Sequence, residues 1–437
     1  MSENEGEGVT MMTMATTGSR QARAAATRAR IVDAARTLFV SNGYRATSLR
    51  DIAAAASVSH PGLLGHFSSK DDLLAEVVAD FEDDNEKAFD LIAAAAEPGE
   101  LIFAAVARRN AVTPGYIELF AALTGEASAS EHPAHQRMRE RYSRLRAMTS
   151  EVLEDAALHG TIDADRDVDD ETVRHMAGWD GVQLIAQYLP ERVDVVRMLE
   201  EREALWALPF GWRDPSEPPV SAEVAGPLPA LTETTVGGLP EMDPGYAVGR
   251  RRRAQILVDA TRLFSRTGYG DTSLRDIAEA VGVSKSTLLH HYASKEQLLS
   301  AVLSERDRSI QVRTSADQHV RAGEALRATP EGARVNAQDE PGLIEVYAVL
   351  SCEAVPSSHP AHGYFAERFR RVIDHFAELF RLAQIDGDLP AHRDPEHEAI
   401  WLLALWDGLQ YQWLYDRSAV DVAAYLRSHL DDVLPPR

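Results

Sequence analysis

The chain contains a single cysteine, Cys352, in 437 residues. One cysteine excludes an internal disulfide and a thiolate metal cluster. No apolar run reaches the roughly 18 to 20 residues that cross a membrane. The sequence also lacks a glycine-rich phosphate loop, a nucleophile elbow and any other recognisable arrangement around a nucleophile. We therefore expect a cytoplasmic protein that is not an enzyme and that has no cofactor, metal site or catalytic residue.

Positive charge is scarce, with 45 Lys and Arg against 68 Asp and Glu and a net charge of -23. Such a balance argues at first against DNA binding. The distribution of charge along the chain changes that inference. Arginines gather at Arg20, Arg23, Arg28 and Arg30 and again at 250–253. Acidic residues gather elsewhere, in stretches such as 80–90 and 151–171. Basic arms beside a distal acidic body are compatible with binding phosphates through one face.

Residues 272–299, TSLRDIAEAVGVSKSTLLHHYASKEQLL, read as three short helices. Ser273 and Asp276 form an S-x-x-D capping pair at the first helix. Gly282 suits the left-handed conformation that ends a helix, and Ser284 and Ser294 suit the caps of the next two. Two helices joined by a short turn that contains glycine form the helix-turn-helix pattern.

The outward face of the second helix distinguishes this segment from an ordinary helical corner in a core. It carries Lys285, Ser286, Thr287 and His291, while Leu288 and Tyr292 would point inward. Cations and short hydroxyl side chains reach phosphates and base edges, and no acidic residue lies among them. The face suits a polyanion.

A near copy of the segment occurs at residues 47–74, TSLRDIAAAASVSHPGLLGHFSSKDDLL, at a shift of 225 residues and without gaps. About half of the aligned positions in and around it are identical. Each copy follows an apolar helix that ends in a Gly-Tyr turn, at Gly43 and Gly268. Repetition of the whole pattern favours the DNA-binding interpretation over a helical corner.

The shared pattern, LF-x3-GY-x2-TSLRDIA-x4-VS-x3-LL-x-H-[FY]-x-SK-x2-LL, resembles the DNA-binding domain of the TetR family of transcriptional regulators. The resemblance implies an all-α fold, in which three helices carry the helix-turn-helix and a larger helical body binds a small-molecule inducer and dimerises. It also implies that double-stranded DNA and an unidentified inducer are the partners. Repression is the commoner mode in the family, although the sequence alone does not decide between repression and activation.

Weaker repeats extend the duplication through the chain at a shift of 227 residues. Gly115 to Leu123 matches Gly342 to Leu350, and Trp179-Asp-Gly-Val-Gln matches Trp406-Asp-Gly-Leu-Gln. We therefore expect a disordered leader at 1–23, a DNA-binding domain at 24–84 and a helical body at 85–208 (together copy 1), a proline-rich linker at 209–248, and a DNA-binding domain at 249–309 and a helical body at 310–437 (together copy 2).

The linker contains eight prolines between Pro209 and Gly249. A flexible coil of about forty residues spans roughly 35 Å, and the recognition helices of a dimer lie about 34 to 36 Å apart on DNA. We expect the two copies to pair with each other as an intramolecular pseudo-dimer, with further self-association of the chain left open.

The resemblance assigns DNA-binding roles to both copies. The first helix of each motif would brace against the DNA backbone through Thr47 and Ser48 or through Thr272 and Ser273. Lys70 or Lys295 would bind phosphate, and the second helix of each motif would enter the major groove. The full set of expected DNA-binding residues is Thr47, Ser48, Arg50, Ser59, His60, Gly62, His66, Lys70, Arg251, Thr272, Ser273, Arg275, Ser284, Lys285, Ser286, Thr287, His291, Tyr292 and Lys295.

Copy 1 departs from the family pattern, since His60-Pro61-Gly62 replaces the Lys-Ser-Thr of copy 2. Leu64 and Leu289 also stand where the family often has tyrosine. Two dissimilar recognition helices predict an asymmetric operator. A ligand-binding or scaffolding protein, in which copy 1 has lost DNA binding and serves mainly for dimerisation, is the alternative.

Other candidate sites carry two interpretations each. The pairs His132/His135 and His359/His362 have a spacing that metal ligands use, yet Pro between the members favours a helix start. Polar residues on two otherwise apolar helices would contact either a ligand or the facing helix; they are Asp180, Gln183, Asp407 and Gln410.

Overall fold

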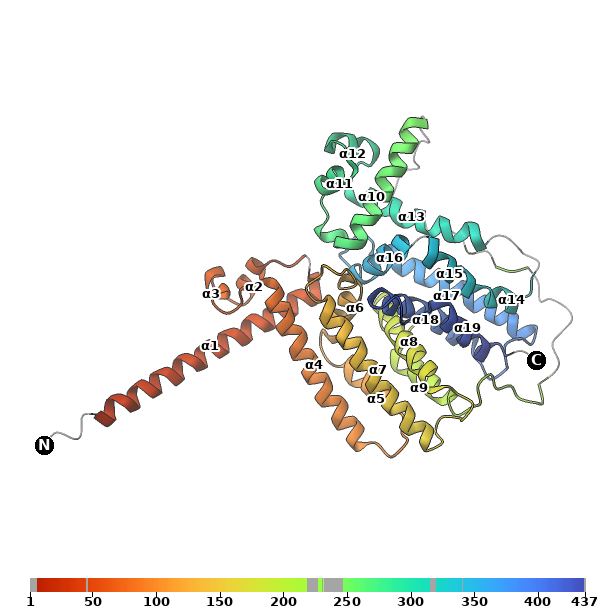
Figure 1. The fold of residues 1–437 in the computed structure, drawn as a ribbon, viewed down its shortest axis with the longest axis horizontal. Coiled ribbons are helices and arrows are strands. Elements are labelled where there is room, and N and C mark those ends of the chain that lie inside the picture. The colour runs from red at the N-terminus through yellow and green to blue at the C-terminus, as the bar shows by residue number, and fades with distance from the viewer. Residues whose placement is uncertain are drawn as a thin grey trace. The chain divides into compact units, whose positions relative to one another are not determined.

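The computed structural model describes residues 6–44, 46–217, 227–229, 231, 247–314, 320–339 and 341–435. All regular secondary structure in these ranges is helical, which confirms the all-α class. The chain divides into two compact units, residues 1–87 and residues 88–437, which we call unit 1 and unit 2. Unit 1 holds the DNA-binding domain of copy 1, and unit 2 holds both helical bodies and the DNA-binding domain of copy 2 (Figure 1).

Unit 1 is built from α1 Gly6–Asn42, α2 Leu49–Ala55, α3 His60–Leu64 and the first part of α4 Lys70–Ala95. The expected apolar face of α4 is buried: Leu73, Leu74, Val77, Val78 and Phe81. Helix α1 begins at Gly6, within the segment that the sequence predicts as a disordered leader. Several alanines between Ala22 and Ala35 favour helix, so the first helix of the DNA-binding domain extends upstream through this segment.

The helices of unit 2 follow the order of the repeat. Those of the copy 1 body are α5 Phe103–Ala111, α6 Tyr116–Glu126, α7 His135–Leu158, α8 Val168–Tyr188 and α9 Val195–Leu205. Those of copy 2 are α10 Ala247–Asp271, α11 Leu274–Val281, α12 Lys285–His291, α13 Lys295–Thr314, α14 Ala322–Arg327, α15 Thr329–Asp339, α16 Pro341–Glu353, α17 His362–Ile385, α18 Pro395–Tyr415 and α19 Val422–Val433.

Helices α8 and α18 are equivalent in the repeat, and they pack against each other in the middle of unit 2 (Figure 1). Aspartates cap both: Asp167 accepts from the backbone N–H of Asp170 at 2.9 Å, and Asp394 accepts from that of His397 at 2.7 Å. Most of α18 is buried around its whole circumference, as expected for a helix that is apolar on all sides.

Glycines bring the two backbones into direct contact. A Cβ atom added to Gly181 would lie 1.9 Å from the carbonyl oxygen of Ala404, and one added to Gly408 would lie 1.8 Å from that of Ala177. Gly181 and Gly408 are equivalent positions, as are Ala177 and Ala404. The same contact therefore occurs twice with the copies exchanged.

A second contact also occurs twice with the copies exchanged, near the C-terminal ends of α8 and α18. The hydroxyl of Tyr415 donates to the carbonyl of Thr124 at 2.9 Å, and that of Tyr188 donates to the carbonyl of Ser351, which is the position equivalent to Thr124. Each ring also stacks on a histidine of the opposite copy, Tyr415 on His135 at 5.5 Å and Tyr188 on His362 at 5.1 Å between centroids.

A buried charge cluster joins the same two copies near the first turns of α8 and α18. Asp432 lies at its centre and accepts from Arg166 of copy 1 and from Arg393 of copy 2, each at 3.1 Å. Arg166 also donates to Glu171 at 2.7 Å, and Arg393 donates to Glu398 at 2.9 Å. Burial raises the pKa of Asp432, but the surrounding guanidinium groups outweigh burial and hold it well below its usual range.

The first residues of the proline-rich segment lie against the bodies. The carbonyl of Pro209 accepts from Arg166 at 3.5 Å, and the backbone N–H of Gly211 donates to Asp432 at 2.8 Å. Arg213 donates to the carbonyls of Gly387 and Asp388. Most of the expected linker beyond residue 217 lies outside the described residues.

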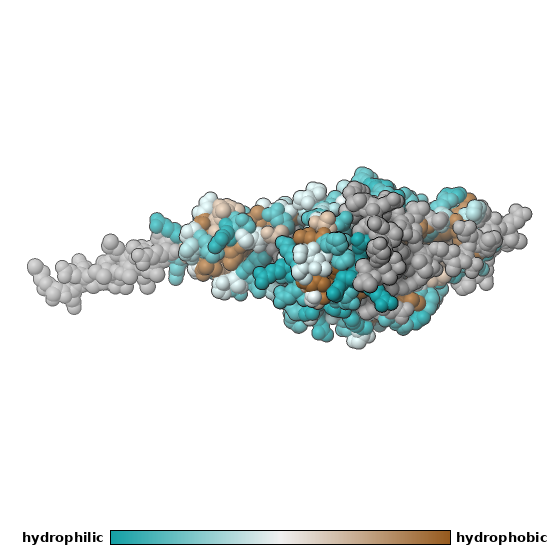
Figure 2. All heavy atoms as spheres, turned by 90° about the horizontal axis from the view of Figure 1, so that it is seen from above, coloured by the Kyte–Doolittle hydropathy of each residue, from teal (hydrophilic) through white to brown (hydrophobic). Residues whose placement is uncertain are grey.

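Hydrophilic side chains cover most of the coloured surface in Figure 2, and hydrophobic ones lie in small separate patches. Within the described part of the chain, no helix has the length and apolar character to cross a membrane. Large exposed hydrophobic residues include Leu64 and Leu289, which occupy the same position in the two copies.

We predict that Gly408→Ala destabilises the protein by about 3 kcal/mol, because the added methyl group must push α8 and α18 apart. Gly332→Ala is the matched control, since nothing lies within 4 Å of its new Cβ. The control should be neutral or stabilising by up to about 1 kcal/mol. Urea unfolding of the full chain measures both, and equal stability of the two variants would contradict the close packing.

Candidate nucleic-acid interface

The helix-turn-helix of copy 2 is formed by α11 and α12, and its caps are those that the sequence predicts. The backbone N–H of Asp276 donates to the Ser273 hydroxyl at 3.2 Å, and the N–H of Ser273 donates back to the Asp276 carboxylate at 2.8 Å. The Ser273 hydroxyl lowers the pKa of Asp276. Gly282 ends α11 in the left-handed conformation at a φ of 71°. These interactions fix where α12 begins.

Helix α12 has one buried and one exposed side. Leu288 is fully buried, whereas Lys285, Ser286 and Thr287 are exposed. Ser284 caps the helix by accepting from the N–H of Thr287 at 3.1 Å. The exposed first turn thus offers one cation and two hydroxyl groups, a set that donates to phosphates and base edges.

His291 lies half-buried at the last turn of α12. Burial lowers its pKa, and the nearby charges of His290, Arg253 and Arg252 lower it further. These groups make the end of α12 rich in nitrogen donors. Arg251 and Arg275 are exposed close to this motif in the chain.

The equivalent helix in copy 1, α3, is a single turn of five residues. Ser59 caps it by accepting from the N–H of Gly62 at 3.1 Å, with Pro61 in the first turn. Pro61 and Gly62 are exposed, and His60 and His66 are half-buried. The helix before it has the same kind of cap as α11, with Ser48 paired to Asp51, and Arg50 is exposed. Copy 1 therefore presents a shorter recognition helix with fewer donors than copy 2.

Three residues expected at the DNA surface are buried. Thr47 and Thr272 are each 2% exposed, and Tyr292 is 1% exposed. The Thr47 hydroxyl donates to the carbonyl of Gly43 at 2.8 Å, and that of Thr272 donates to the carbonyl of Gly268 at 2.6 Å. These side chains lie in the Gly-Tyr turn and the core of the motif, and they do not face the solvent.

The two lysines expected to bind phosphate lie at the start of the helix after each motif. The Lys70 ammonium donates to the carbonyls of Tyr44 and Thr47 at 3.0 and 3.1 Å and lies 4.3 Å from the centre of the Tyr44 ring. Lys295 lies 4.0 Å from the centre of the Tyr269 ring. Each lysine thus packs on the tyrosine of the Gly-Tyr turn.

A contact that the sequence did not reveal fastens the copy 2 motif to its own body. The backbone N–H of Tyr269 donates to Glu353 at the end of α16, at 2.6 Å, and the Tyr269 ring packs edge-on against His359. Burial lowers the pKa of His359 to about 4. The only sequence signal for this contact was the same spacing of Glu and His in the two copies, at Glu126/His132 and Glu353/His359.

The turn inside the copy 1 motif carries strain that the sequence also did not reveal. Ser57 adopts a φ of 54°, at the position that Gly282 occupies in copy 2. A left-handed conformation costs a residue with a Cβ atom about 1 to 2 kcal/mol.

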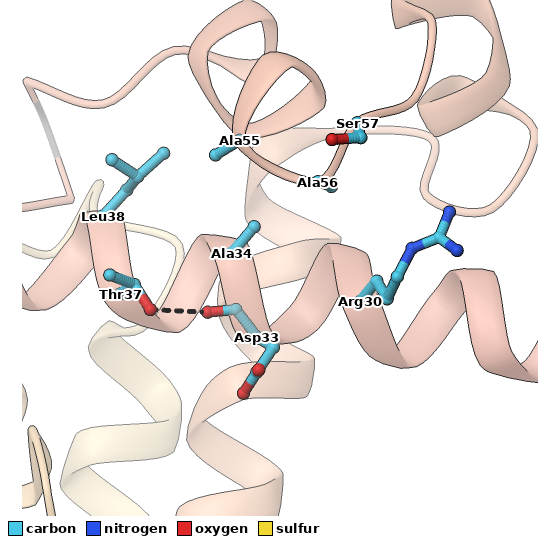
Figure 3. A pocket seen from close by; sticks show the side chains of 8 residues that line it. All are labelled: Arg30, Asp33, Ala34, Thr37, Leu38, Ala55, Ala56 and Ser57. Carbon is cyan, nitrogen blue, oxygen red and sulfur yellow. Dashed lines mark hydrogen bonds between the residues drawn. The ribbon is translucent and has the colours of Figure 1, made fainter.

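A pocket of about 590 Å³ lies beside this strained turn (Figure 3). Helix α1 and the end of α2 line it with Arg30, Asp33, Ala34, Thr37, Leu38, Ala55, Ala56 and Ser57. Copy 2 has the larger residues Asp259, Arg262 and Val281 where copy 1 has Ala34, Thr37 and Ala56. Copy 1 therefore has smaller side chains than copy 2 at three positions of the lining of this pocket.

The four polar residues of α8 and α18 lie within the bodies. Asp180 accepts from the Tyr142 hydroxyl at 3.0 Å, and Asp407 accepts from the Tyr347 hydroxyl at 3.3 Å. Gln410 is buried and Gln183 half-buried. Burial raises the pKa of Asp180 to about 6, against the opposing effects of the Tyr142 hydrogen bond and of Arg141.

The four paired histidines form hydrogen bonds within the loops before α7 and α17. His132 accepts from the N–H of Ala134 at 3.1 Å, and His359 accepts from that of Ala361 at 3.2 Å. His135 and His362 each bond through Nδ1 to a backbone carbonyl. Among the described residues, no cluster of three or more His, Cys, Asp or Glu side chains could hold a metal ion.

Two helix-turn-helix motifs, one of which has an exposed face of a cation and hydroxyl groups, place the chain among helix-turn-helix transcriptional regulators. Residues 31–77 and 256–302 match the family described as bacterial regulatory proteins of the tetR family, and residues 348–435 match the C-terminal region of BetI-type transcriptional repressors. The transcriptional repressor KstR2 of Rhodococcus jostii is 30% identical over 149 residues, which cover 32% of this chain and 71% of that repressor. The chain belongs to the TetR family.

Other relatives match a similar share of this chain. The transcriptional regulator TtgR of Pseudomonas putida is 27% identical over 195 residues, 41% of this chain and 88% of TtgR. Among solved structures, a TetR family regulator from Agrobacterium tumefaciens has 22% identity and a TM-score of 0.38, over 43% of this chain and 99% of its own. A transcriptional regulator from Saccharomonospora viridis in complex with choline has 26% identity and a TM-score of 0.37, over 42% and 95%.

We predict that Ser57→Gly stabilises the copy 1 motif by about 1 kcal/mol, because glycine adopts a positive φ without steric cost. Gly282→Ser should destabilise the copy 2 motif by a similar amount. Hydrogen exchange of peptides from α2, α3, α11 and α12 in the full chain follows each motif separately. Slower exchange in Gly282→Ser than in the wild type would contradict the strain assigned to this turn.

The raised pKa of Asp180 predicts a pH-dependent effect of Asp180→Asn. The folded-state pKa lies above the ordinary value of 3.8, so the wild type loses stability as the pH rises from about 4 to about 6, and the amide does not. The variant should therefore gain about 1 to 3 kcal/mol relative to the wild type across this window.

The control for this prediction is Tyr142→Phe, which removes a hydroxyl that favours the carboxylate. As the pH rises, the Tyr142→Phe variant should lose stability at a higher pH than the wild type does. Urea unfolding at a series of pH values measures both variants. A stability difference between Asp180→Asn and the wild type that is constant from pH 4 to pH 7 would refute the assignment.

Proposed function

We propose that the protein is a ligand-responsive, sequence-specific repressor in which copies 1 and 2 form the two halves of a built-in dimer. The observation that carries this proposal is the reciprocity of the contacts between the bodies. Gly181 meets Ala404 as Gly408 meets Ala177, and Tyr188 and Tyr415 exchange in the same way. Reciprocal contacts of this kind are those of a two-fold, isologous dimer interface.

The operator of such a protein is asymmetric, because its two recognition helices differ. Copy 2 offers Lys285, Ser286 and Thr287, and copy 1 offers His60 and Gly62. An exposed leucine follows in each, Leu64 at 43% and Leu289 at 37% exposure. Aliphatic side chains at a recognition helix contact the methyl group of thymine, so both half-sites contain thymine, whereas the polar contacts differ.

The inducer site lies in the bodies, where Asp180 and Asp407, with Gln183 and Gln410, are the candidate ligand residues. A carboxylate buried among aromatic rings favours a ligand that brings a positive charge or hydrogen-bond donors. The Tyr142 hydroxyl of copy 1 donates to Asp180, and the ring of Tyr415 from copy 2 lies against Tyr142, with the ring centroids 5.2 Å apart. Release of operator DNA by candidate cations, tested in the wild type and in Asp180→Asn, examines this assignment.

The short α3 also supports a second candidate function, in which copy 1 serves only to pair with copy 2. In that case His60→Glu with His66→Glu would leave DNA affinity unchanged. If both copies bind DNA, the two introduced glutamates repel phosphate and weaken binding at least tenfold. A loss of this size is on the order of the energy of one or two base contacts.

A DNase footprint of the full chain on the DNA upstream of its own gene tests the proposal. Two unequal protected half-sites about one helical turn apart are expected. Protection of a single half-site would support the second candidate. Absence of specific protection there and in genome-wide binding selection would overturn both functions.

We predict that Lys285→Ala combined with Thr287→Ala weakens binding to the operator by at least tenfold, since each base contact contributes about 1 to 3 kcal/mol. His60→Ala should have an effect of about threefold or less, because α3 offers fewer donors. Arg381→Ala, on an exposed face of the body, is the control. Titration by fluorescence anisotropy at two salt concentrations measures all three, and a larger loss in His60→Ala would reverse the assigned order.

A further inference from the structure

The buried charge cluster between the bodies is not symmetric, although the pairing around it is. Four buried arginines face three buried carboxylates: Arg166, Arg174, Arg202 and Arg393 with Glu171, Glu398 and Asp432. All of these side chains are nearly or completely buried. A fourth carboxylate, Asp170, is partly exposed and lies 3.8 Å from Arg174. Charges without water must be matched by charges of the opposite sign, so the composition of this cluster decides which surfaces can pair.

The two copies contribute different parts of the cluster. Arg166 and Glu171 have exact counterparts in Arg393 and Glu398. In contrast, Arg174 corresponds to Trp401, Arg202 corresponds to His429, and Leu205 corresponds to Asp432. Copy 1 supplies the surplus of arginine, and copy 2 supplies the central carboxylate.

A pair of like copies would leave these charges unmatched. Two copy 1 bodies would bring together six arginines and two carboxylates. Two copy 2 bodies would bring together four carboxylates and two arginines, beside two histidines whose pKa burial lowers well below the ordinary value. Removing one member of a buried pair is strongly destabilising, because the remaining charge stays out of water.

Packing at the same interface adds a second, independent mismatch. The ring of Trp401 occupies the space beside Gly178, where an added Cβ atom would lie 2.4 Å from the ring. The copy 2 position equivalent to Gly178 is Leu405, so two copy 2 bodies would press tryptophan onto leucine. Cys352 of copy 2 also packs against Gly125, which is the equivalent residue of copy 1. A Cβ atom added to Gly125 would lie 2.6 Å from the Cβ of Cys352.

We infer that this interface accepts only the opposite copy and rejects the like copy of another chain. The inference rests on the pairing in the proposed function and extends it to the choice of partner. Copies 1 and 2 can pair within one chain. They can also pair between two chains, when copy 1 of each chain packs against copy 2 of the other. Chains therefore do not join copy 1 to copy 1, nor copy 2 to copy 2, and a symmetric homodimer of either copy is excluded.

Substitutions in the full chain imitate each rejected pair. Arg202→His with Leu205→Asp gives copy 1 the residues of copy 2, and the cluster then holds four carboxylates and three arginines. His429→Arg with Asp432→Leu gives copy 2 the residues of copy 1, and the cluster then holds five arginines and two carboxylates. The quadruple variant exchanges the residues between the copies and restores four arginines and three carboxylates.

We expect each double variant to lower the folding equilibrium constant by about a hundredfold or more, and the quadruple variant to recover at least tenfold of that loss. Urea unfolding with light scattering, which checks the mass, measures stability and association together. The control is Arg197→His with Asp431→Leu, at exposed positions of the same two helices. It should match the wild type.

Double variants as stable as the wild type would overturn the inference, because the cluster would then tolerate like pairing. A quadruple variant no more stable than the weaker double variant would overturn it too, since the losses would then reflect damage to each helix alone. Recovery in the quadruple variant supports it even where a double variant fails to fold. None of these readouts involves DNA, so an absent footprint contradicts the proposed function separately.

Discussion

Direct backbone contact between α8 and α18 is the constraint on which the rest of unit 2 depends. Gly181 and Gly408 allow it, because any side chain at either position would overlap a carbonyl of the facing helix. Once these helices touch, their remaining residues have fixed neighbours. Tyr188 and Tyr415 reach the opposite copy near one end, and Arg166, Arg393 and Asp432 meet near the other.

The same duplication supplies two recognition helices of unequal chemistry. Copy 2 keeps the relaxed glycine turn, the full-length α12 and a cation with two hydroxyl groups in its first turn. Its motif is also held to the body through Tyr269 and Glu353. Copy 1 has a strained serine turn, a one-turn α3 and an open pocket beside them. Fusion of the copies permits this divergence, because each half of the interface is encoded separately.

The local features of the motif could be predicted from the sequence, since they depend on residues three or four positions apart. The pair Ser273/Asp276, the end of α11 at Gly282 and the inward Leu288 are all found as expected. Burial of Thr47, Thr272 and Tyr292 could not be predicted, because it depends on the turn that each helix packs against. The charge cluster was missed for a similar reason. Its members lie up to 266 residues apart, and nothing local distinguishes Arg166 from a solvated arginine.

We propose that one chain, with its copies 1 and 2 paired, is the complete DNA-reading dimer. Native mass spectrometry of the full chain bound to its footprinted operator tests it most directly. We expect one chain of 48.0 kDa on each operator of two unequal half-sites. Two chains bound to one operator with two identical half-sites, each contacted by the same copy, would contradict it.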